Sequence, residues 1–289
     1  MGIKRIALIN DLSGLGKCSL TAAIPVISAM GLQACPLPTA VLSAQTGFEG
    51  YYFDDYTDRM NRITDHWYEM KMTFDGIASG YLGNAGQIEN LLYFLDKFHG
   101  ADTIFLADPV MGDNGKRIKS FSEDLLSAMR RLTSKAEVIT PNLTELCLLA
   151  GEEYGDITAT MDHGEDVYLE KIQAVAEKVL AEAEVPQTVI TTGIRRKTKE
   201  AEYIGNLIVT ADATSYHESP YTGQSFSGTG DLFASVVIGE MVQGRDADSA
   251  VKKAMAFLQP AIEEATAEKI DRNHGVNFEK YLGMLIPRA

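Results

Sequence analysis

The segment with the clearest chemical meaning reads SFSGTGDLFASVVIGEMV and spans residues 225–242. Its glycine turn precedes Asp231 and an apolar stretch that predicts a helix. Peptide N–H groups of such a turn form an anion-binding site, which the helix dipole strengthens. Asp231 fits beside that site if it takes a proton from an attacking hydroxyl while the turn stabilises a transferring phosphoryl group. The alternative interpretation is a carboxylate that only caps the helix.

Three further polar groups follow predicted strands. Asp108 ends an apolar run and precedes a flexible, glycine-containing loop suited to covering a ligand. Asn142 and Glu145 have the spacing of a helix-capping pair, which needs no further function. Glu145 and Asp108 also offer the oxygen ligands that Mg²⁺ prefers, held directly or through water. Thr191 and Thr192 end another apolar run and present two hydroxyls suited to phosphate or ribose.

The stretch NDLSGLGKCS at residues 10–19 has the look of a nucleotide phosphate loop. A Walker A loop would require Gly at position 11 and Ser or Thr at position 18, where the chain has Asp11 and Cys18. A dinucleotide fingerprint would require a third glycine where Ser19 stands. The stretch is therefore not a P-loop. One interpretation of its glycines is a turn that lets a strand pack tightly against a helix, and the other is a loop that faces the second substrate, where Gly14 and Gly16 let the backbone come close.

Short apolar runs alternate with helical patterns along the chain. The predicted strands cover residues 5–10, 32–37, 74–79, 103–108, 137–141 and 188–192. The predicted helices cover roughly residues 17–30, 58–70, 84–99, 122–133, 142–150, 164–184, 229–243 and 247–267. Several runs are apolar throughout, as is typical of parallel strands covered on both faces. The alternation predicts an α/β fold with a doubly wound, mostly parallel sheet and helices on both faces.

Residues 201–217 depart from this alternation and predict two consecutive strands with a turn near Ala211 and Asp212. They are expected to add an antiparallel hairpin at one side of the sheet. No low-complexity linker or internal repeat is present, so one domain is expected over residues 1–289. Ligands of such folds bind at the carboxyl ends of the strands, which is where the polar groups described above are expected to lie.

Charge and composition exclude several classes of protein. The chain has 289 residues and a formal net charge of −14, which argues against a nucleic-acid-binding surface. The basic run IRRKTK at 194–199 is expected to be a solvated hairpin-like turn. Three widely spaced cysteines predict neither a disulfide framework nor a zinc site. No signal peptide or membrane span is recognisable, so no membrane partner and a cytoplasmic location are expected.

With these motifs, the chain resembles the ribokinase superfamily, specifically its pyridoxal kinase-like branch. The resemblance covers nearly the full length. It rests on GTGD at 228–231, DPVMGD at 108–113, TPNLTE at 140–145, SGYLG at 79–83 and LPTAVLSAQTG at 37–47. It implies a ribokinase-like three-layer sandwich and ATP-dependent phosphorylation of the hydroxymethyl group of a vitamin B6 vitamer. It also implies Mg²⁺, a homodimer, and possible dependence on a monovalent cation.

The resemblance implies a role for each motif. Asp231 would be the base that activates the hydroxymethyl group, and the backbone of Gly228, Thr229 and Gly230 would form the anion hole. The residues implied to serve ATP or Mg²⁺ are Asp108, Asn142, Glu145, Thr191 and Thr192, with Asp108 and Glu145 at the metal. The residues implied on the vitamer side are Asp11, Thr46, Gly47, Tyr81 and Asp231. Residues 112–122 would act as a lid. Tyr81 offers a π-face to an electron-poor ring, and Thr46 offers a hydroxyl.

The first loop departs from the branch, because Asp11-Leu12 stands where known pyridoxal kinases have a Ser-His pair. It is closer to the Asp-Pro-Ser-Gly-Gly turn of hydroxymethylpyrimidine kinases. Asp11 is expected to accept a hydrogen bond from a ring N–H, a phenolic hydroxyl or an exocyclic amine, the last favouring pyridoxamine or an aminopyrimidine. Hydroxymethylpyrimidine phosphorylation is therefore the alternative activity, and a non-catalytic vitamer-binding protein is the alternative of a different class.

Overall fold

Apolar runs at the predicted positions form the strands of this computed structural model, which describes residues 2–118 and 121–287 and all of their side chains except those of 162 and 163. The chain divides into two compact units. The first unit comprises Met1–Leu106 and Thr222–Ala289, and the second comprises Ala107–Tyr221. The expectation that residues 1–289 behave as one domain stays a prediction.

The strands of the first unit follow the hydrogen-bonded order β5 (Ile104–Ala107), β4 (Gly76–Ser79), β1 (Arg5–Ser13), β2 (Gln33–Leu42) and β3 (Phe53–Asp55). β1 pairs in parallel with both β4 and β2, whereas β3 pairs antiparallel with β2. Four consecutive apolar residues of β1, at 6–9, are all buried. This is the reason for the absence of alternation in that run, since a central parallel strand is covered on both faces.

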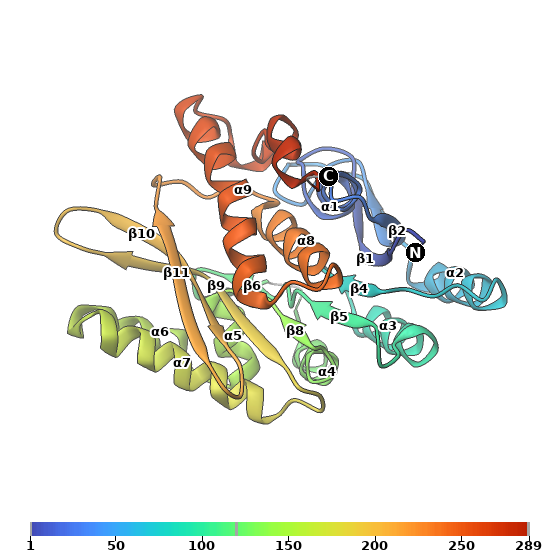
Figure 1. Cartoon of the computed structure of the whole chain (residues 1–289), viewed down its shortest axis with the longest axis horizontal. Coiled ribbons are helices and arrows are strands. Elements are labelled where there is room, and N and C mark those ends of the chain that lie inside the picture. Colours follow the sequence, from blue (N-terminus) through green and yellow to red (C-terminus); the bar gives the residue numbers. More distant parts are fainter. Residues whose placement is uncertain (1, 119–120, 288–289) are drawn as a thin grey trace. The chain divides into compact units, whose positions relative to one another are not determined.

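The helices of the first unit are α1 (Ser19–Ala29), α2 (Thr57–Glu69), α3 (Ala85–Phe98), α8 (Thr229–Val242) and α9 (Ala247–Ala267). In Figure 1, α1, α8 and α9 gather on one side of β1 and β4, and α2 and α3 lie on the other. Gly76 lets α8 approach β4 closely, because a Cβ there would lie 2.6 Å from Val242. Two 3₁₀ helices, Arg272–His274 and Phe278–Leu285, follow α9.

The second unit is built on strands in the order β11 (Thr214–Pro220), β10 (Glu202–Val209), β9 (Thr188–Lys197) and β8 (Val138–Ile139). β8 and β9 are parallel, and β10 is antiparallel to both β9 and β11. Its helices are α4 (Glu123–Thr133), α5 (Leu143–Ala150), α6 (Tyr154–Thr158), a 3₁₀ helix at Ala159–His163, and α7 (Glu165–Ala181). A small ribbon pairs β6 (Gly112–Asp113) with β7 (Lys116–Arg117).

These elements confirm the predicted α/β fold with a mostly parallel sheet and an antiparallel edge. Every strand and helix predicted from the sequence is present, and the hairpin predicted at 201–217 is formed by β10 and β11. The sequence did not reveal β3 and α6, which are three and five residues long. Within the described part of the chain, no helix is both long and apolar enough to cross a membrane.

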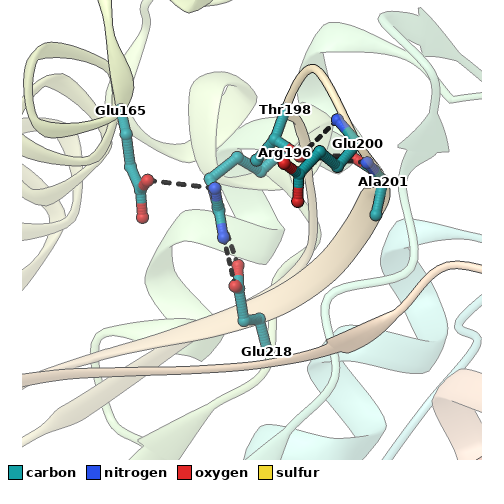
Figure 2. A network of polar contacts seen from close by, with 6 residues as sticks. All are labelled: Glu165, Arg196, Thr198, Glu200, Ala201 and Glu218. Atoms are coloured by element: carbon teal, nitrogen blue, oxygen red, sulfur yellow. Dashed lines mark hydrogen bonds and ion pairs between the residues drawn. The ribbon is translucent and has the colours of Figure 1, made fainter.

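The expectation of a solvated turn at 194–199 is wrong for residues 194–197, because β9 continues to Lys197. Arg196 lies on this extension and is ion-paired with Glu165 at the start of α7 and with Glu218 on β11 (Figure 2). Its guanidinium also lies 4.7 Å from the centre of the Tyr203 ring. The turn itself begins at Thr198, whose hydroxyl accepts hydrogen bonds from the peptides of Glu200 and Ala201. Arg196 therefore ties the hairpin to α7.

Replacing Arg196 with Met keeps an aliphatic chain over Tyr203 and removes the guanidinium. We expect the free energy of unfolding to fall by about 1–3 kcal/mol, because the part-buried carboxylate of Glu218 loses its guanidinium partner. Urea denaturation at neutral pH measures the loss. Lys197→Met is the matched control, since that side chain is 74% exposed and pairs with Glu202 at the surface. We expect the control to leave the urea denaturation midpoint almost unchanged, because an exposed ion pair contributes little to stability. Equal losses in both variants would contradict this role for Arg196.

Candidate active site

The predicted anion hole begins with a glycine in a conformation that few other residues adopt. Gly228 is the N-cap of α8 and has φ 82°, in the left-handed region. A Cβ at this position would lie 2.1 Å from the carbonyl oxygen of Lys17 in the first loop. Gly228 is therefore needed both for its backbone conformation and for the approach of this loop. The Thr229 hydroxyl donates to the carbonyl of Phe226, 3.0 Å away, so Thr229 can serve an anion through its peptide N–H.

Asp231 lies in the first turn of α8 and is half-buried. The pKa of Asp231 is raised to about 6, mainly by burial and also by the nearby charge of Asp11. Hydrogen bonds from the Ser19 peptide and the Asn10 side chain act in the opposite direction and limit this rise. The Asn10 amide donates to Asp231 across 2.9 Å. A carboxylate with a raised pKa is ionised near neutrality and is a stronger base than an exposed one. This arrangement suits proton abstraction from a hydroxyl.

The lysine of the first loop has a structural role in place of a phosphate-binding one. The ammonium group of Lys17 contacts Asn277 at 2.8 Å and Glu279 at 2.9 Å, both in the C-terminal segment. Cys18 is 7% exposed, and burial raises the pKa of its thiol to about 12. Cys18 therefore behaves as a small buried apolar residue. These observations agree with the absence of a P-loop pattern.

Asp11 lies within an irregularity of β1, between Asn10 and Leu12, and is 6% exposed. One of its carboxylate oxygens accepts from the Ser13 hydroxyl at 2.6 Å and the other from the Ser19 hydroxyl at 2.7 Å. Both oxygens are thus engaged within the first loop and the start of α1. Any hydrogen bond that Asp11 accepts from a substrate would have to use the remaining lone pairs of its carboxylate. The predicted contact between Asp11 and a ring stays a prediction.

The other residues predicted on the vitamer side lie on loops of the same unit. Two hydrogen bonds hold the backbone of Tyr81. Its N–H donates to the side chain of Asn10, and its carbonyl accepts from the hydroxyl of Thr39. Burial, followed by the nearby Asp11, raises the pKa of the Tyr81 hydroxyl, so this group stays protonated at neutral pH. Thr46 is exposed. Gly47 lies against Asn273, and a Cβ there would be 2.4 Å from the Asn273 side-chain oxygen.

Two amide side chains that organise this region were not among the sequence predictions. Asn10 joins Asp231 to the Tyr81 peptide. Gln45 is 9% exposed, accepts from the Gly47 peptide, and donates to Ser227 and to the carbonyl of Asn273. The sequence holds one signal that could have indicated Asn10, namely its position as a polar residue at the end of an apolar run. Gln45 has no such signal, since its partners are distant in the chain.

In the second unit, Asn142 and Glu145 form a complete capping box at the start of α5. The Glu145 carboxylate accepts from the peptides of Asn142 at 2.8 Å and Met111 at 3.0 Å, and the residue is 4% exposed. Burial and the charge of Asp108 raise the pKa of Glu145 well above its usual range. The capping interpretation is therefore confirmed. The repulsion between these two carboxylates also fits a cation, because a divalent ion would relieve it.

Within the described part of the chain, no group of three or more His, Cys, Asp or Glu side chains is arranged to hold a metal ion. A pair of carboxylates still fits Mg²⁺, which commonly binds through one or two carboxylates and keeps several waters. Asp108 and Glu145 thus stay the predicted metal ligands.

Of the two threonines predicted to contact the nucleotide, only one is accessible. Thr191 is 0% exposed, and its hydroxyl is buried without a hydrogen-bond partner. Thr192 is half-buried and pairs with Asn142 through an isolated parallel bridge. The physical reason is the position along β9, because both faces of the strand are covered at residues 189–191 and full burial stops at Thr192. Thr192 is therefore the better candidate, and the expectation for Thr191 is not supported by its burial.

The segment expected to be a flexible loop over the ligand is a hairpin between 112 and 117. Asn114 and Gly115 occupy its turn with φ 51° and 72°, as a two-residue turn between antiparallel strands requires. The ribbon is tied to the start of α5, because the Asn142 amide donates to the Gly112 carbonyl and the Gly115 peptide donates to the Thr144 hydroxyl. Residues 119 and 120 of the predicted lid lie outside the described residues.

Comparison with known proteins agrees with this geometry. A sequence profile of the phosphomethylpyrimidine kinase family matches residues 16–277. A pyridoxal kinase, PdxY, from Corynebacterium diphtheriae is 26% identical over 255 residues, which cover 86% of this chain and 84% of the relative. Two solved structures also match closely. One is a candidate phosphomethylpyrimidine kinase from Bacteroides thetaiotaomicron, in a crystal form with pyridoxal, with TM-score 0.87, 36% identity, and coverage of 100% of this chain and 97% of the other.

The second is a pyridoxal kinase from Lactobacillus plantarum, with TM-score 0.85, 25% identity, and coverage of 98% and 97% of the two chains. Fold, motifs and relatives together define a phosphotransferase with an α/β fold. The chain belongs to the phosphomethylpyrimidine kinase family. Its resemblance to the pyridoxal kinase-like branch is confirmed.

Replacing Gly228 with Ala tests the close approach at the anion hole. We expect the free energy of unfolding to fall by about 2–4 kcal/mol, because the methyl group meets the Lys17 carbonyl in a left-handed backbone. Chemical denaturation measures this. Gly223→Ala is the matched control, since Gly223 has φ 85° and nothing within 4 Å of its Cβ position. The control isolates the backbone cost, about 1 kcal/mol. Equal costs would show that the approach of Lys17 is not limiting.

Replacing Asp231 with Asn removes the cost of ionising a part-buried carboxyl. Because folding raises the pKa of Asp231 from 3.8 to about 6, the unfolded chain releases the Asp231 proton at a lower pH than the folded protein does. Stability is therefore lost as pH rises through this window. We expect the variant to gain about 1–2 kcal/mol over the wild type between pH 4 and pH 6, allowing for partial exposure, and to keep that gain above pH 6. Thermal unfolding across pH 4–8 measures it, and a difference that does not change with pH would be inconsistent with the raised pKa.

Proposed function

We propose that the protein phosphorylates the hydroxymethyl group of a vitamin B6 vitamer (pyridoxal, pyridoxamine or pyridoxine) with ATP, giving the 5′-phosphate. The reaction would salvage the vitamer in the cytoplasm, and the protein would act as a homodimer. Support comes from membership of a kinase family and from similarity to pyridoxal kinases and to a structure with pyridoxal. The observation on which the proposal rests most directly is the Asp231 carboxyl with its raised pKa, next to the glycine turn at the start of α8.

In this proposal Asp231 takes the proton of the substrate hydroxymethyl group as the oxygen attacks phosphorus. The peptide N–H groups of the glycine turn and the α8 dipole stabilise the negative charge of the transferred group. Phosphoryl transfer needs little covalent chemistry from the protein, so positioning and charge stabilisation supply most of the catalysis. An N–H donor at Ser19 keeps the carboxyl available in its ionised form at neutral pH, against the effect of burial.

The vitamer ring is assigned to the loops that present Tyr81, Thr46 and Gly47. The Tyr81 ring would stack on the heteroaromatic ring, and its peptide is fixed by Asn10 and Thr39. Thr46 is exposed and offers its hydroxyl to a ring substituent. The engagement of both Asp11 oxygens within the first loop argues for a structural role of this residue, which weakens the expected preference for an amine-bearing vitamer.

The nucleotide is assigned to the second unit. Asp108 and Glu145 would hold Mg²⁺, which neutralises phosphate charge when bound. Thr192 and Asn142 would contact the nucleotide. A parallel backbone bridge between these two residues holds Thr192 beside Asn142, the N-cap of α5. The ribbon at 112–117 is tied to the same helix start by Asn142 and Thr144. It would cover the phosphates without a long unstructured loop.

Phosphorylation of a hydroxymethylpyrimidine is the second candidate activity. Two observations favour it, namely the family profile that matches the chain and the Asp-Leu-Ser-Gly first loop. Both candidates use the same base and the same anion hole, so they differ only in the ring that is bound. A protein that binds vitamers without catalysis is a third possibility, but it would have no use for a base with a raised pKa beside an anion site.

A vitamer-resolved kinase assay tests the proposal. We expect ADP formation with ATP, Mg²⁺ and at least one B6 vitamer, with a higher kcat/KM than for hydroxymethylpyrimidine. Because the base must be ionised, kcat/KM should fall about tenfold per pH unit below roughly pH 6, in keeping with the raised pKa of Asp231. Asp231→Asn should lower kcat at least 100-fold and leave vitamer binding within about threefold.

Three results of this assay would count against the proposal. A higher kcat/KM for hydroxymethylpyrimidine would favour the second activity. Vitamer binding without ADP formation would favour the non-catalytic protein. Unchanged turnover in Asp231→Asn would exclude this residue as the base.

A further inference from the structure

Asn10 lies on β1 directly after the buried apolar run at 6–9 and is 8% exposed. Its side-chain oxygen accepts from two peptides, that of Asp11 at 2.9 Å and that of Tyr81 at 3.0 Å. Both partners are N–H donors, so the oxygen of the amide must face them. The amide therefore cannot rotate by half a turn, and its NH₂ group must point away from these peptides.

The NH₂ group of Asn10 meets the carboxylate of Asp231, with 2.9 Å between nitrogen and oxygen. This group can only donate, so it pairs best with an ionised carboxylate. One short side chain thus spans β1, the loop after β4 and the start of α8. Local packing leaves it little freedom, because a Cβ at Gly80 would lie 2.2 Å from the Asn10 nitrogen.

We propose that Asn10 is a positioning residue for the reaction, which holds the Asp231 carboxylate in the ionised form and in a fixed orientation relative to the Tyr81 peptide. This inference rests on the proposed role of Asp231 as the base. Asn10 contacts neither substrate in the proposal and acts through Asp231 and the backbone of the ring-binding loop. No motif named in the sequence analysis contains it as a functional residue.

The groups that face Asp231 come from β1 and from the start of α1. Asp11 on β1 and Cys18 just before α1 interact with it electrostatically, and the Ser19 peptide at the start of α1 donates to it. Cys18 is neutral at physiological pH, because burial raises the pKa of its thiol to about 12. Apart from the Ser19 peptide and its own backbone, Asn10 is the donor that offsets burial and the charge of Asp11.

The test compares Asn10→Ala with the wild type in the vitamer kinase assay across pH 5–9. We expect kcat to fall about 10- to 100-fold, the KM for ATP to stay within about threefold, and the acidic limb of the kcat profile to move to higher pH by about half a unit or more. The limb moves because loss of the donor favours the protonated form of Asp231. A protein that had lost only packing would show no movement of the limb.

Gly80→Ala perturbs the same contact without changing Asn10. Its methyl group meets the Asn10 nitrogen, and the backbone of Gly80 is not left-handed, so the chain can accept the residue. We expect a limb shift in the same direction as that of Asn10→Ala. Gly100→Ala, with nothing within 4 Å of its Cβ position, is the control for this substitution. Asn90→Ala is the control for loss of an asparagine, because the Asn90 amide donates to the Thr57 carbonyl and accepts from the Asn61 side chain, both on α2.

Two different failures can be told apart. An active wild type, an inactive Asp231→Asn, and an Asn10→Ala with unchanged kcat and an unmoved limb would overturn the role of Asn10 alone. A wild type without vitamer-dependent turnover would overturn the proposed function instead. Movement of the limb in Asn90→Ala as large as that in Asn10→Ala would also overturn the proposal, since the effect would then be general.

Discussion

The close approach of the first loop to the start of α8 is the constraint on which the candidate site depends. A Cβ at Gly228 would lie 2.1 Å from the Lys17 carbonyl oxygen, and a Cβ at Gly275 would lie 2.9 Å from the Gly16 carbonyl oxygen. The first loop, the turn before α8 and the segment at Gly275 can therefore come together only because glycines stand at their contacts. Their contact brings the first peptide of α1 to Asp231, where it donates a hydrogen bond. A carboxylate beside two helix starts is stabilised by both dipoles, which is why it can be partly buried and still ionise near neutrality.

Buried amides hold this arrangement in the absence of regular secondary structure. Asn10 and Gln45 each connect segments that are far apart in the chain, and each satisfies peptide groups that no strand or helix pairs. A buried polar group that is fully hydrogen-bonded specifies one geometry, because every alternative leaves an unpaired donor or acceptor. The loops of the site can therefore be well defined while they stay free of helix and strand.

Glu145 shows that a structural and a chemical role can belong to one carboxylate. It completes the capping box of α5 and ties down the segment after Asp108 through the Met111 peptide. The same burial that makes it a good cap raises its pKa, and the charge of Asp108 adds to this effect. The two interpretations considered from the sequence are thus compatible, because a cap uses some lone pairs of the carboxylate and leaves others for a cation.

The sequence by itself determined the elements and the kind of chemistry. Strand and helix positions follow from local apolar patterns, and the glycine turn with Asp231 is contiguous, so its anion site and base could be inferred from adjacent residues. Tertiary structure alone decided which polar groups are accessible and which serve the fold. Thr191 is fully buried, whereas Thr192 is accessible. Both carboxylate oxygens of Asp11 accept hydrogen bonds from serine hydroxyls, and Lys17 pairs with Glu279. Asn10 and Gln45 were not predicted, because their partners are up to 228 positions away in the chain. Hydrogen bonds between distant segments leave no periodic trace in a sequence, whereas burial along a strand or helix does.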